Sequence, residues 1–135
     1  MLTDSERDSL RLAAAEAADN AHAPYSEFRV GAAVLGARSM YRGTNVENAS
    51  YGLALCAERS ALSAAVAAGD REIRGLAVAC VDADPAAGTE ERMPCGACRQ
   101  WILELAPDAE ILIQGVDEVL HIADLLPRAF RLGRK

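Results

Sequence analysis

Residues 28–46, FRVGAAVLGARSMYRGTNV, contain two short apolar segments separated by a turn. The first segment, Phe28–Leu35, is predicted to form a β-strand. The second, Met40–Val46, is its predicted hairpin partner across the turn Gly36–Ser39. This stretch therefore predicts an antiparallel pair of strands.

A helix is predicted on the N-terminal side of this hairpin. Residues 3–6, Thr-Asp-Ser-Glu, have the spacing of a capping box, with Thr3 as the N-cap and Glu6 able to reach back to it. The alanine-rich stretch that follows predicts a helix to about Asn20, and Pro24 closes the segment. One face of this helix carries four apolar residues: Leu10, Ala13, Ala14 and Ala17.

Helices and strands alternate on the C-terminal side of the hairpin. A helix is predicted over residues 56–68, and Gly69 suits the left-handed position that often ends a helix. The remaining segments are, in order, an apolar strand over 73–81, a Pro/Gly/acid-rich loop over 82–93, a helix from Pro94 or Cys95 to Pro107, a buried strand over 110–114 and a helical turn over 123–126. This alternation predicts an α/β protein, a three-layer α/β/α sandwich with a mixed central sheet, formed by a single domain over residues 1–135.

The composition excludes several classes of protein. The chain has 135 residues (14.3 kDa), of which 51% are hydrophobic and 28 are alanine, so it can form a packed core and is not disordered. Its formal charge of -6 opposes binding to a phosphate backbone, so we expect no nucleic-acid partner. No apolar run approaches the ~20 residues of a spanning helix, and the polar, acidic N-terminus differs from a signal peptide. We therefore expect a cytoplasmic protein that does not bind membranes.

Three of the four cysteines stand where helices are predicted to begin. Cys56 opens one helix, and the CGAC segment 95–98 opens the next. The partial positive charge of a helix N-terminus favours thiolate over thiol and so prepares a sulfur for a metal. Three thiolates are one ligand short of a closed structural zinc site, whereas a catalytic zinc keeps one position open for water. Glu58, two residues after Cys56, adds an acid/base to this set.

Other interpretations of these residues stay open at this level. A Cys-x-x-Cys pair is also typical of a redox dithiol or of half a structural zinc site. Cys80 offers a fourth thiol, but it stands in a predicted apolar strand, where cysteine packs as a small hydrophobe. Glu58 taken alone is typical of a solvated helix residue. The combination favours a catalytic zinc site.

Five motifs stand in order along the chain: PYSEFRVGAA (24–33), NVENASYG (45–52), CAER (56–59), PCGACRQ (94–100) and LLPRAF (125–130). Over nearly its whole length the chain resembles the small, homotetrameric, zinc-dependent cytidine deaminases. The resemblance implies a hydrolase with one Zn²⁺ per subunit, held by Cys56, Cys95 and Cys98, and with Glu58 as the catalytic proton carrier. It also implies deamination of cytidine and 2′-deoxycytidine with release of ammonia, as in pyrimidine salvage. The alternatives are a deaminase of a modified cytosine nucleoside and a non-catalytic zinc or dithiol protein.

The same resemblance assigns residues to the substrate. Phe28 matches the ring that packs against the base, and Asn45 and Glu47 match the pair that hydrogen-bonds the sugar hydroxyls. The backbone N–H of Ala57 is implied to bind the polar edge of the base. Taken alone, Phe28 is equally typical of a core residue, and Asn45 and Glu47 of a turn and a strand edge. Two residues apart in a strand, however, Asn45 and Glu47 point to one face.

Residues far from the cysteines are implied in assembly. Ala49, Tyr51 and Phe130 match positions that reach a neighbouring subunit's site, which implies a homotetramer with composite active sites. Taken alone, Phe130 is typical of a residue that anchors a C-terminus. The nucleoside substrate and further copies of the chain are the partners that the resemblance implies.

Two arginines flank the cysteines in the sequence. Three thiolates and Zn²⁺ sum to a charge of about -1, and Arg59 and Arg99 are placed to offset it by hydrogen bonds to sulfur. Trp101, on the same predicted helix as Arg99, is expected to fill the core.

The chain departs from the family pattern in three places. The segment Gly36–Ser39 replaces an Asp-Gly hairpin turn, Met93 replaces a serine, and the loop over 82–93 is long and acidic. Met93 and this loop are expected to adjust the rim of the site and with it the range of substrates.

Overall fold

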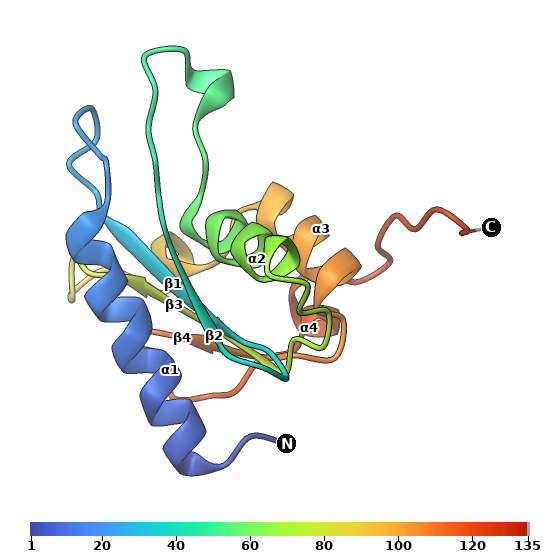
Figure 1. Ribbon diagram of the computed structural model, residues 1–135. Coiled ribbons are helices and arrows are strands. Elements are labelled where there is room, and N and C mark those ends of the chain that lie inside the picture. Colours follow the sequence, from blue (N-terminus) through green and yellow to red (C-terminus); the bar gives the residue numbers. More distant parts are fainter. Residues whose placement is uncertain (135) are drawn as a thin grey trace.

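The computed structural model describes residues 1–134 and contains a four-stranded sheet between helices (Figure 1). The strands are β1 (Val30–Leu35), β2 (Met40–Thr44), β3 (Gly75–Cys80) and β4 (Glu110–Ile113). Their order across the sheet is β2-β1-β3-β4, with β1 antiparallel to both β2 and β3, and β3 parallel to β4. The predicted hairpin and the predicted mixed sheet are confirmed.

Helices cover both faces of this sheet. They are α1 (Asp4–Ala17), α2 (Ala57–Ala67), α3 (Gly96–Leu105) and α4 (Ile122–Leu125), with 3₁₀ turns at Ala18–Asn20, Tyr51–Leu53 and Glu90–Arg92. Figure 1 shows α1 on one face of the sheet, and α2 and α3 on the other. The predicted three-layer α/β/α sandwich is therefore confirmed. Within residues 1–134, no helix combines the length and the apolar character that crossing a membrane requires.

Two strand glycines let the helices approach the sheet closely. A Cβ on Gly31 of β1 would stand 1.9 Å from the carbonyl oxygen of Ala14 in α1. A Cβ on Gly43 of β2 would stand 2.3 Å from the amide nitrogen of Ala61 in α2. Both contacts involve backbone atoms, so a side chain at either position would displace the helix. Glycine in β2 thus sets the position of α2, whose first turn forms part of the site described below.

Predicted element boundaries agree with the structure to within about two residues. Thr3 and Glu6 form the predicted capping box at the start of α1 through both reciprocal hydrogen bonds. The strand β1 begins at Val30 and not at Phe28, because the Asn45 side chain forms hydrogen bonds with the backbone groups that would otherwise pair with a neighbouring strand here. Its Nδ2 donates to the Phe28 carbonyl (2.8 Å), and its Oδ1 accepts from the Val30 amide (2.9 Å).

The hairpin turn Gly36–Ser39 is stabilised by a residue outside the hairpin. Asp70, buried after α2, accepts hydrogen bonds from the backbone amides of Arg38 (2.9 Å) and Ala37 (3.1 Å) and from the Tyr41 hydroxyl (3.0 Å). These bonds, that from the Arg38 amide foremost, lower the pKa of Asp70 to about 2. The turn therefore closes without the Asp-Gly pair that the family pattern contains.

The prediction that Trp101 fills the core is wrong. Its side chain is 37% exposed and borders a cavity that it shares with Ser63 and Val66 of α2. The helix α3 turns Cys98 and Ile102 inward, both fully buried. Successive residues of an α-helix are about 100° apart, so Trp101 points away from the direction that Ile102 takes.

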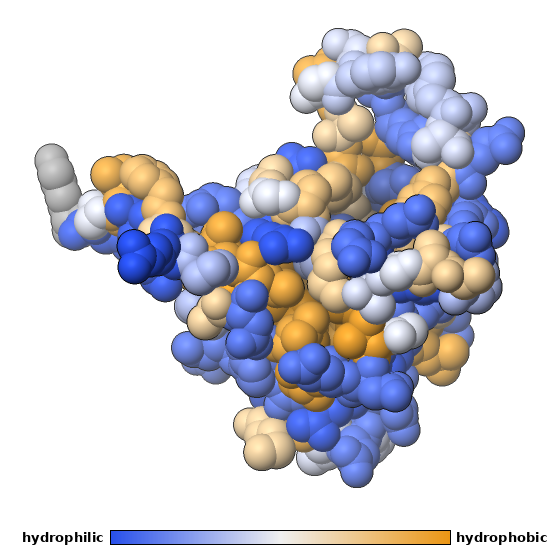
Figure 2. All heavy atoms as spheres, turned by 180° about the vertical axis from the view of Figure 1, so that it is seen from behind, coloured by the Kyte–Doolittle hydropathy of each residue, from blue (hydrophilic) through white to orange (hydrophobic). Residues whose placement is uncertain are grey.

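Two segments project from the sandwich, residues 45–56 and residues 126–134 (Figure 1). Each carries large apolar side chains in solvent: Tyr51 is 80% exposed and Phe130 is 70% exposed. Figure 2 shows further apolar residues on the face next to the base of the C-terminal segment. A single chain leaves these side chains without a partner within the described residues.

Candidate active site

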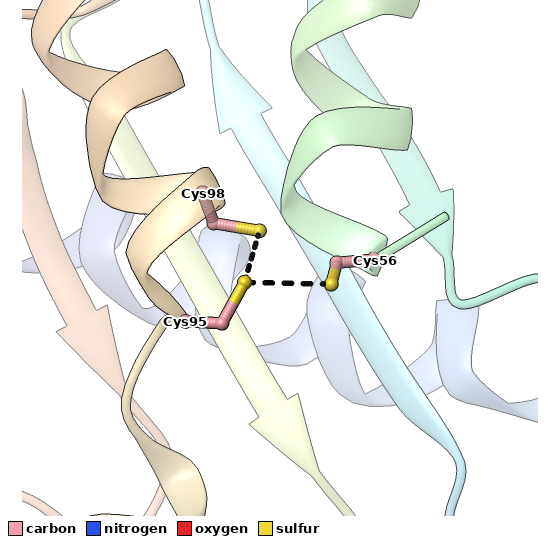
Figure 3. Close-up of side chains that lie close together, drawn as sticks. All are labelled: Cys56, Cys95 and Cys98. Atoms are coloured by element: carbon pink, nitrogen blue, oxygen red, sulfur yellow. Dashed lines mark hydrogen bonds between the residues drawn. The ribbon is translucent and has the colours of Figure 1, made fainter. Parts of the chain in front are cut away.

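The N-termini of α2 and α3 bring three cysteines together (Figure 3). Cys56 and Cys95 are the N-cap residues of α2 and α3, and Cys98 lies in the first turn of α3. The Sγ atom of Cys95 is 3.7 Å from that of Cys56 and 3.5 Å from that of Cys98. All three sulfurs lie within 4.8 Å of one another. The extended backbone at the two caps directs both side chains towards the shared end of the helices.

This cysteine cluster fits a zinc ion. In a tetrahedral site with Zn–S bonds of about 2.3 Å, neighbouring sulfurs are about 3.8 Å apart, close to the two spacings found here. All four cysteines of the chain are free thiols. Cys80 is not part of the cluster: it is buried in β3, as predicted, and its sulfur contacts the Glu91 carbonyl. Three sulfur ligands leave one tetrahedral position for a molecule from solvent.

The surroundings of the cluster favour ionisation of one thiol. The hydrogen bond from Cys98 and a further one from Arg59 lower the pKa of Cys56 to about 5. The pKa of Cys98 is raised by the same hydrogen bond to Cys56 and by burial. Zinc binds thiolates, so binding would release the proton that Cys98 holds.

Glu58 lies in the first turn of α2, beside the cluster, and only 5% of its surface is exposed. Burial raises its pKa from 4.5 to about 7. A carboxyl group whose pKa lies near neutrality both accepts and donates protons at physiological pH. The alternative interpretation of Glu58 as a solvated helix residue is therefore wrong.

Cys56, Cys95 and Glu58 border a cavity of about 240 Å³. Its other lining residues come from β1, the segment after β2, the start of α2, the end of β3 and the segment before α3: Phe28, Val30, Asn45, Glu47, Ala54, Leu55, Ala57, Cys80, Glu91 and Met93. A cavity that combines a near-neutral carboxyl group with converging metal ligands is the default candidate for an active site.

Comparison with known proteins agrees with this geometry. A family model described as the cytidine and deoxycytidylate deaminase zinc-binding region matches residues 4–114. This chain belongs to that deaminase family. It is 42% identical over 130 residues to a cytidine deaminase of Halalkalibacterium halodurans, covering 93% of this chain and 94% of that protein. A crystal structure of cytidine deaminase from Burkholderia pseudomallei has a TM-score of 0.80 and 45% identity, covering 96% of this chain and 100% of that one.

A second relative covers slightly more of the chain. The cytidine deaminase of Mycobacterium tuberculosis is 42% identical over 132 residues, which is 97% of this chain and 94% of that protein. Its crystal structure has a TM-score of 0.78 at 36% identity and covers 97% of this chain and 100% of that one. The similarity to cytidine deaminases therefore includes the C-terminal residues after β4, which the family model does not match.

The two arginines that flank the deaminase cysteines have different partners. Arg59 Nη2 donates to Cys56 Sγ at 3.4 Å, the contact that the sequence predicts. The predicted contact of Arg99 with sulfur is wrong. Its Nε donates to the Pro94 carbonyl (2.8 Å) and its Nη1 to the Leu125 carbonyl (2.6 Å). Arg99 follows Cys98 by one position, about 100° around α3, and so it faces α4 and ties the segment before Cys95 to it.

Asn45 and Glu47 line the deaminase cavity together, on one side, and both are held by hydrogen bonds. Asn45 bonds the backbone at the start of β1, as described above. The Glu47 carboxylate accepts from the backbone amides of Tyr25 (3.0 Å) and Ser26 (3.1 Å) and from the Ser26 hydroxyl. These bonds, that from the Ser26 hydroxyl foremost, lower the pKa of Glu47, so its carboxylate is ionised and oriented before any ligand arrives.

The sequence motif 24–33 contains a contact that sequence reasoning missed. The backbone amides of Tyr25 and Ser26, to which the sequence assigns no role, donate to the Glu47 carboxylate and orient it. Their presence in a motif that also supplies Phe28 was the available signal. Cys80 was assigned to the core alone, and the structure shows that it is also a wall of the cavity.

The remaining predicted residues separate into two groups. Phe28 and Ala57 line the cavity. Ala57 is the first residue of α2, so its N–H has no partner within the helix. Ala49, Tyr51 and Phe130 do not line the cavity of their own chain. Tyr51 projects from the tip of the segment after β2, and the Phe130 carbonyl is bound by Gln100 of α3 at 3.0 Å.

Proposed function

We propose that this protein is a zinc-dependent cytidine deaminase, which hydrolyses cytidine and 2′-deoxycytidine to uridine and 2′-deoxyuridine with release of ammonia. The observation that carries the proposal is the placement of buried Glu58 beside three sulfurs at zinc-ligand spacing. Membership of the deaminase family and 42% identity to named cytidine deaminases support it. The alternative of a redox dithiol explains Cys95 and Cys98 but neither Cys56 nor the near-neutral pKa of Glu58.

The three cysteines would hold the zinc, and Glu58 would move the protons. When bound, zinc lowers the pKa of a coordinated water from ~15.7 towards ~7 and so supplies a nucleophile at neutral pH. Glu58 would accept a proton from the attacking water and donate it to N3 of the cytosine ring as the water oxygen adds to C4. Glu58 then carries the second proton to the 4-amino group, the C4–N bond breaks, and ammonia leaves while the C4 carbonyl forms. Water and cytidine are thereby converted to ammonia and uridine.

The cavity walls would orient the nucleoside. The unpaired N–H of Ala57 donates to the polar edge of the base, and Phe28 packs against the ring. The ionised Glu47 carboxylate accepts hydrogen bonds from the sugar hydroxyls, and Asn45 stands beside it to complete the contact. Free cytosine lacks these hydroxyls, so the carboxylate favours a nucleoside over the free base.

The proposal also covers the oligomeric state of the protein and its location in the cell. Exposed Tyr51 and Phe130, with Ala49, would complete the sites of neighbouring copies in a homotetramer. A site completed in this way explains why two large aromatic side chains lie in solvent in the isolated chain. A nucleoside deaminase of this kind would work in pyrimidine salvage in the cytoplasm.

The test is ammonia release from cytidine, 2′-deoxycytidine and cytosine by the zinc-loaded protein. Glu58→Gln keeps the shape of the side chain and removes the proton carrier, so we expect a loss of at least ~10²–10⁴-fold in kcat with one zinc per chain retained. Glu16→Gln, an exposed change on α1, is the matched control and should retain activity. A metal-free protein with a reversible Cys95–Cys98 disulfide and no ammonia release would refute the proposal in favour of the dithiol alternative.

A further inference from the structure

The mouth of the cavity carries negative charge without a matching cation. Besides buried Glu58, the lining residues include two further acidic residues, Glu47 and Glu91. Among the described residues, no lysine, arginine or histidine lines this cavity. Within one chain, Glu47 and Glu91 are thus the charged lining residues besides Glu58.

Glu47 and Glu91 follow the two strands that flank β1, namely β2 and β3. Val30 of β1 and Cys80 of β3 are register partners and form the middle of the lining. The strand order β2-β1-β3 puts Glu47, which follows β2, on one side of this pair. Glu91, in the 3₁₀ turn that follows β3, stands on the other. The two acidic residues therefore come to the cavity lining from different edges of the strand pair β1–β3.

The neighbouring cations are engaged elsewhere. Arg92, adjacent to Glu91, donates to the Gln114 carbonyl at 3.3 Å and lies against Gly115. Arg29, next to Phe28, forms a two-pronged ion pair with Asp82 at 2.9 Å. Glu91 itself is exposed and forms no ion pair within residues 1–134. Burial foremost, and also the charges of Glu58 and Glu91, raise the pKa of Cys80 in the cavity wall, whereas the charge of Arg92 lowers it.

We infer that Glu91 is a specificity-determining residue of the deaminase site, which sorts cytosine nucleosides by the charge of the group carried on the sugar. A cationic group is favoured over a neutral one, and an anionic group such as a 5′-phosphate is rejected. The inference rests on the proposed function and adds a residue and a selection rule to it. Glu47 accepts hydrogen bonds from Tyr25 and Ser26 and is proposed to bind the sugar hydroxyls. Glu91 accepts no such hydrogen bond and acts through its charge alone.

The test uses three substrates whose 5′ group is cationic, neutral or anionic: 5′-amino-5′-deoxycytidine, cytidine and cytidine 5′-monophosphate. The readout is the ratio of kcat/KM for the amine to that for the monophosphate, because a ratio within one enzyme cancels any general change in activity. Glu91→Gln removes the charge and keeps the size of the side chain. Glu90→Gln is the matched control: it removes the same charge one residue away, in the same 3₁₀ turn, from a residue that does not line the cavity.

We expect the wild-type order amine, cytidine, monophosphate. Glu91→Gln should reduce the amine-to-monophosphate ratio by roughly tenfold at 0.1 M ionic strength, since one charge acts with opposite sign on the two substrates. The reduction should largely disappear at 1 M, where the screening length falls from about 10 Å to about 3 Å. Glu90→Gln should change the ratio less than about twofold.

Two results would overturn the inference. One is an unchanged ratio in Glu91→Gln, and the other is an equal reduction in Glu90→Gln, which would assign the effect to the net charge of the loop. If the zinc-loaded wild type deaminates none of the three substrates, the proposed function fails and the inference fails with it. Deamination of cytidine with no response to Glu91→Gln leaves the proposed function intact and removes the inference alone.

Discussion

Arg59→Gln tests how this site offsets the charge of three thiolates. The Arg59 guanidinium donates to Cys56 Sγ at 3.4 Å, and the fixed positive charge lies beside the cluster. A hydrogen bond to a charged group contributes ~1.5–3 kcal/mol, and ~1.4 kcal/mol corresponds to a factor of ten. We therefore expect zinc affinity to fall by roughly 10- to 100-fold, the range typical of residues that orient metal ligands. Competition for zinc with a chelator of known affinity measures the effect independently of enzyme activity.

The control for this change is Arg42→Gln, which removes the same charge from an exposed position on β2. It should leave zinc affinity within about twofold of the wild type. Arg59→Lys separates charge from geometry: it keeps the charge but not the planar fork, so we expect an intermediate affinity. Unchanged zinc affinity in Arg59→Gln, with circular dichroism showing an intact fold, would refute the reasoning that Arg59 stabilises the thiolates.

Three further predictions concern buried carboxyl groups and assembly. Burial raises the pKa of Glu58 above its unfolded value, so the contribution of Glu58 to stability is present below about pH 4.5 and is lost as the pH rises through about 7. At pH 8, metal-free Glu58→Gln should therefore unfold at a higher urea concentration than the metal-free wild type. Equal urea midpoints for the two proteins would contradict this prediction. Hydrogen bonds from backbone amides lower the pKa of Asp70, so its contribution is present above about pH 4 and lost as the pH falls towards 2. Asp70→Asn should thus lower the melting temperature at pH 7, with a difference from the wild type that shrinks towards pH 2. Phe130→Ala should reduce activity without reducing zinc content, and a fully active monomer by light scattering would contradict the composite site.

Much of this fold follows from local patterns. The capping box at Thr3 and the glycine at 69, which has a φ of +80°, mark helix ends whose hydrogen bonds form between residues a few positions apart. Short apolar runs predict each of the four strands for the same reason: a strand's length and burial depend on its own residues. The cysteines at 56, 95 and 98 are also local signals, because each stands at the start of a helix and the chemistry of a thiolate at a helix N-terminus does not depend on distant segments.

Side-chain partners, in contrast, were decided by the tertiary structure. Arg59 and Arg99 both stand near cysteines at the start of a helix, but the face on which each lies gives one a sulfur partner and the other two carbonyl groups. Trp101 is exposed because the face of α3 that points inward carries Cys98 and Ile102.

The same holds for residues that meet across the chain. Asp70 stabilises a turn more than thirty positions away, and Glu91 lines the same cavity as Glu47, which stands far earlier in the sequence. The sequence by itself determined the elements and the chemistry that each one carries, since these depend on neighbours along the chain. Which of those groups meet, and which stay in solvent, depends on how the helices lie on the sheet, and that arrangement is set by packing between residues far apart in the sequence.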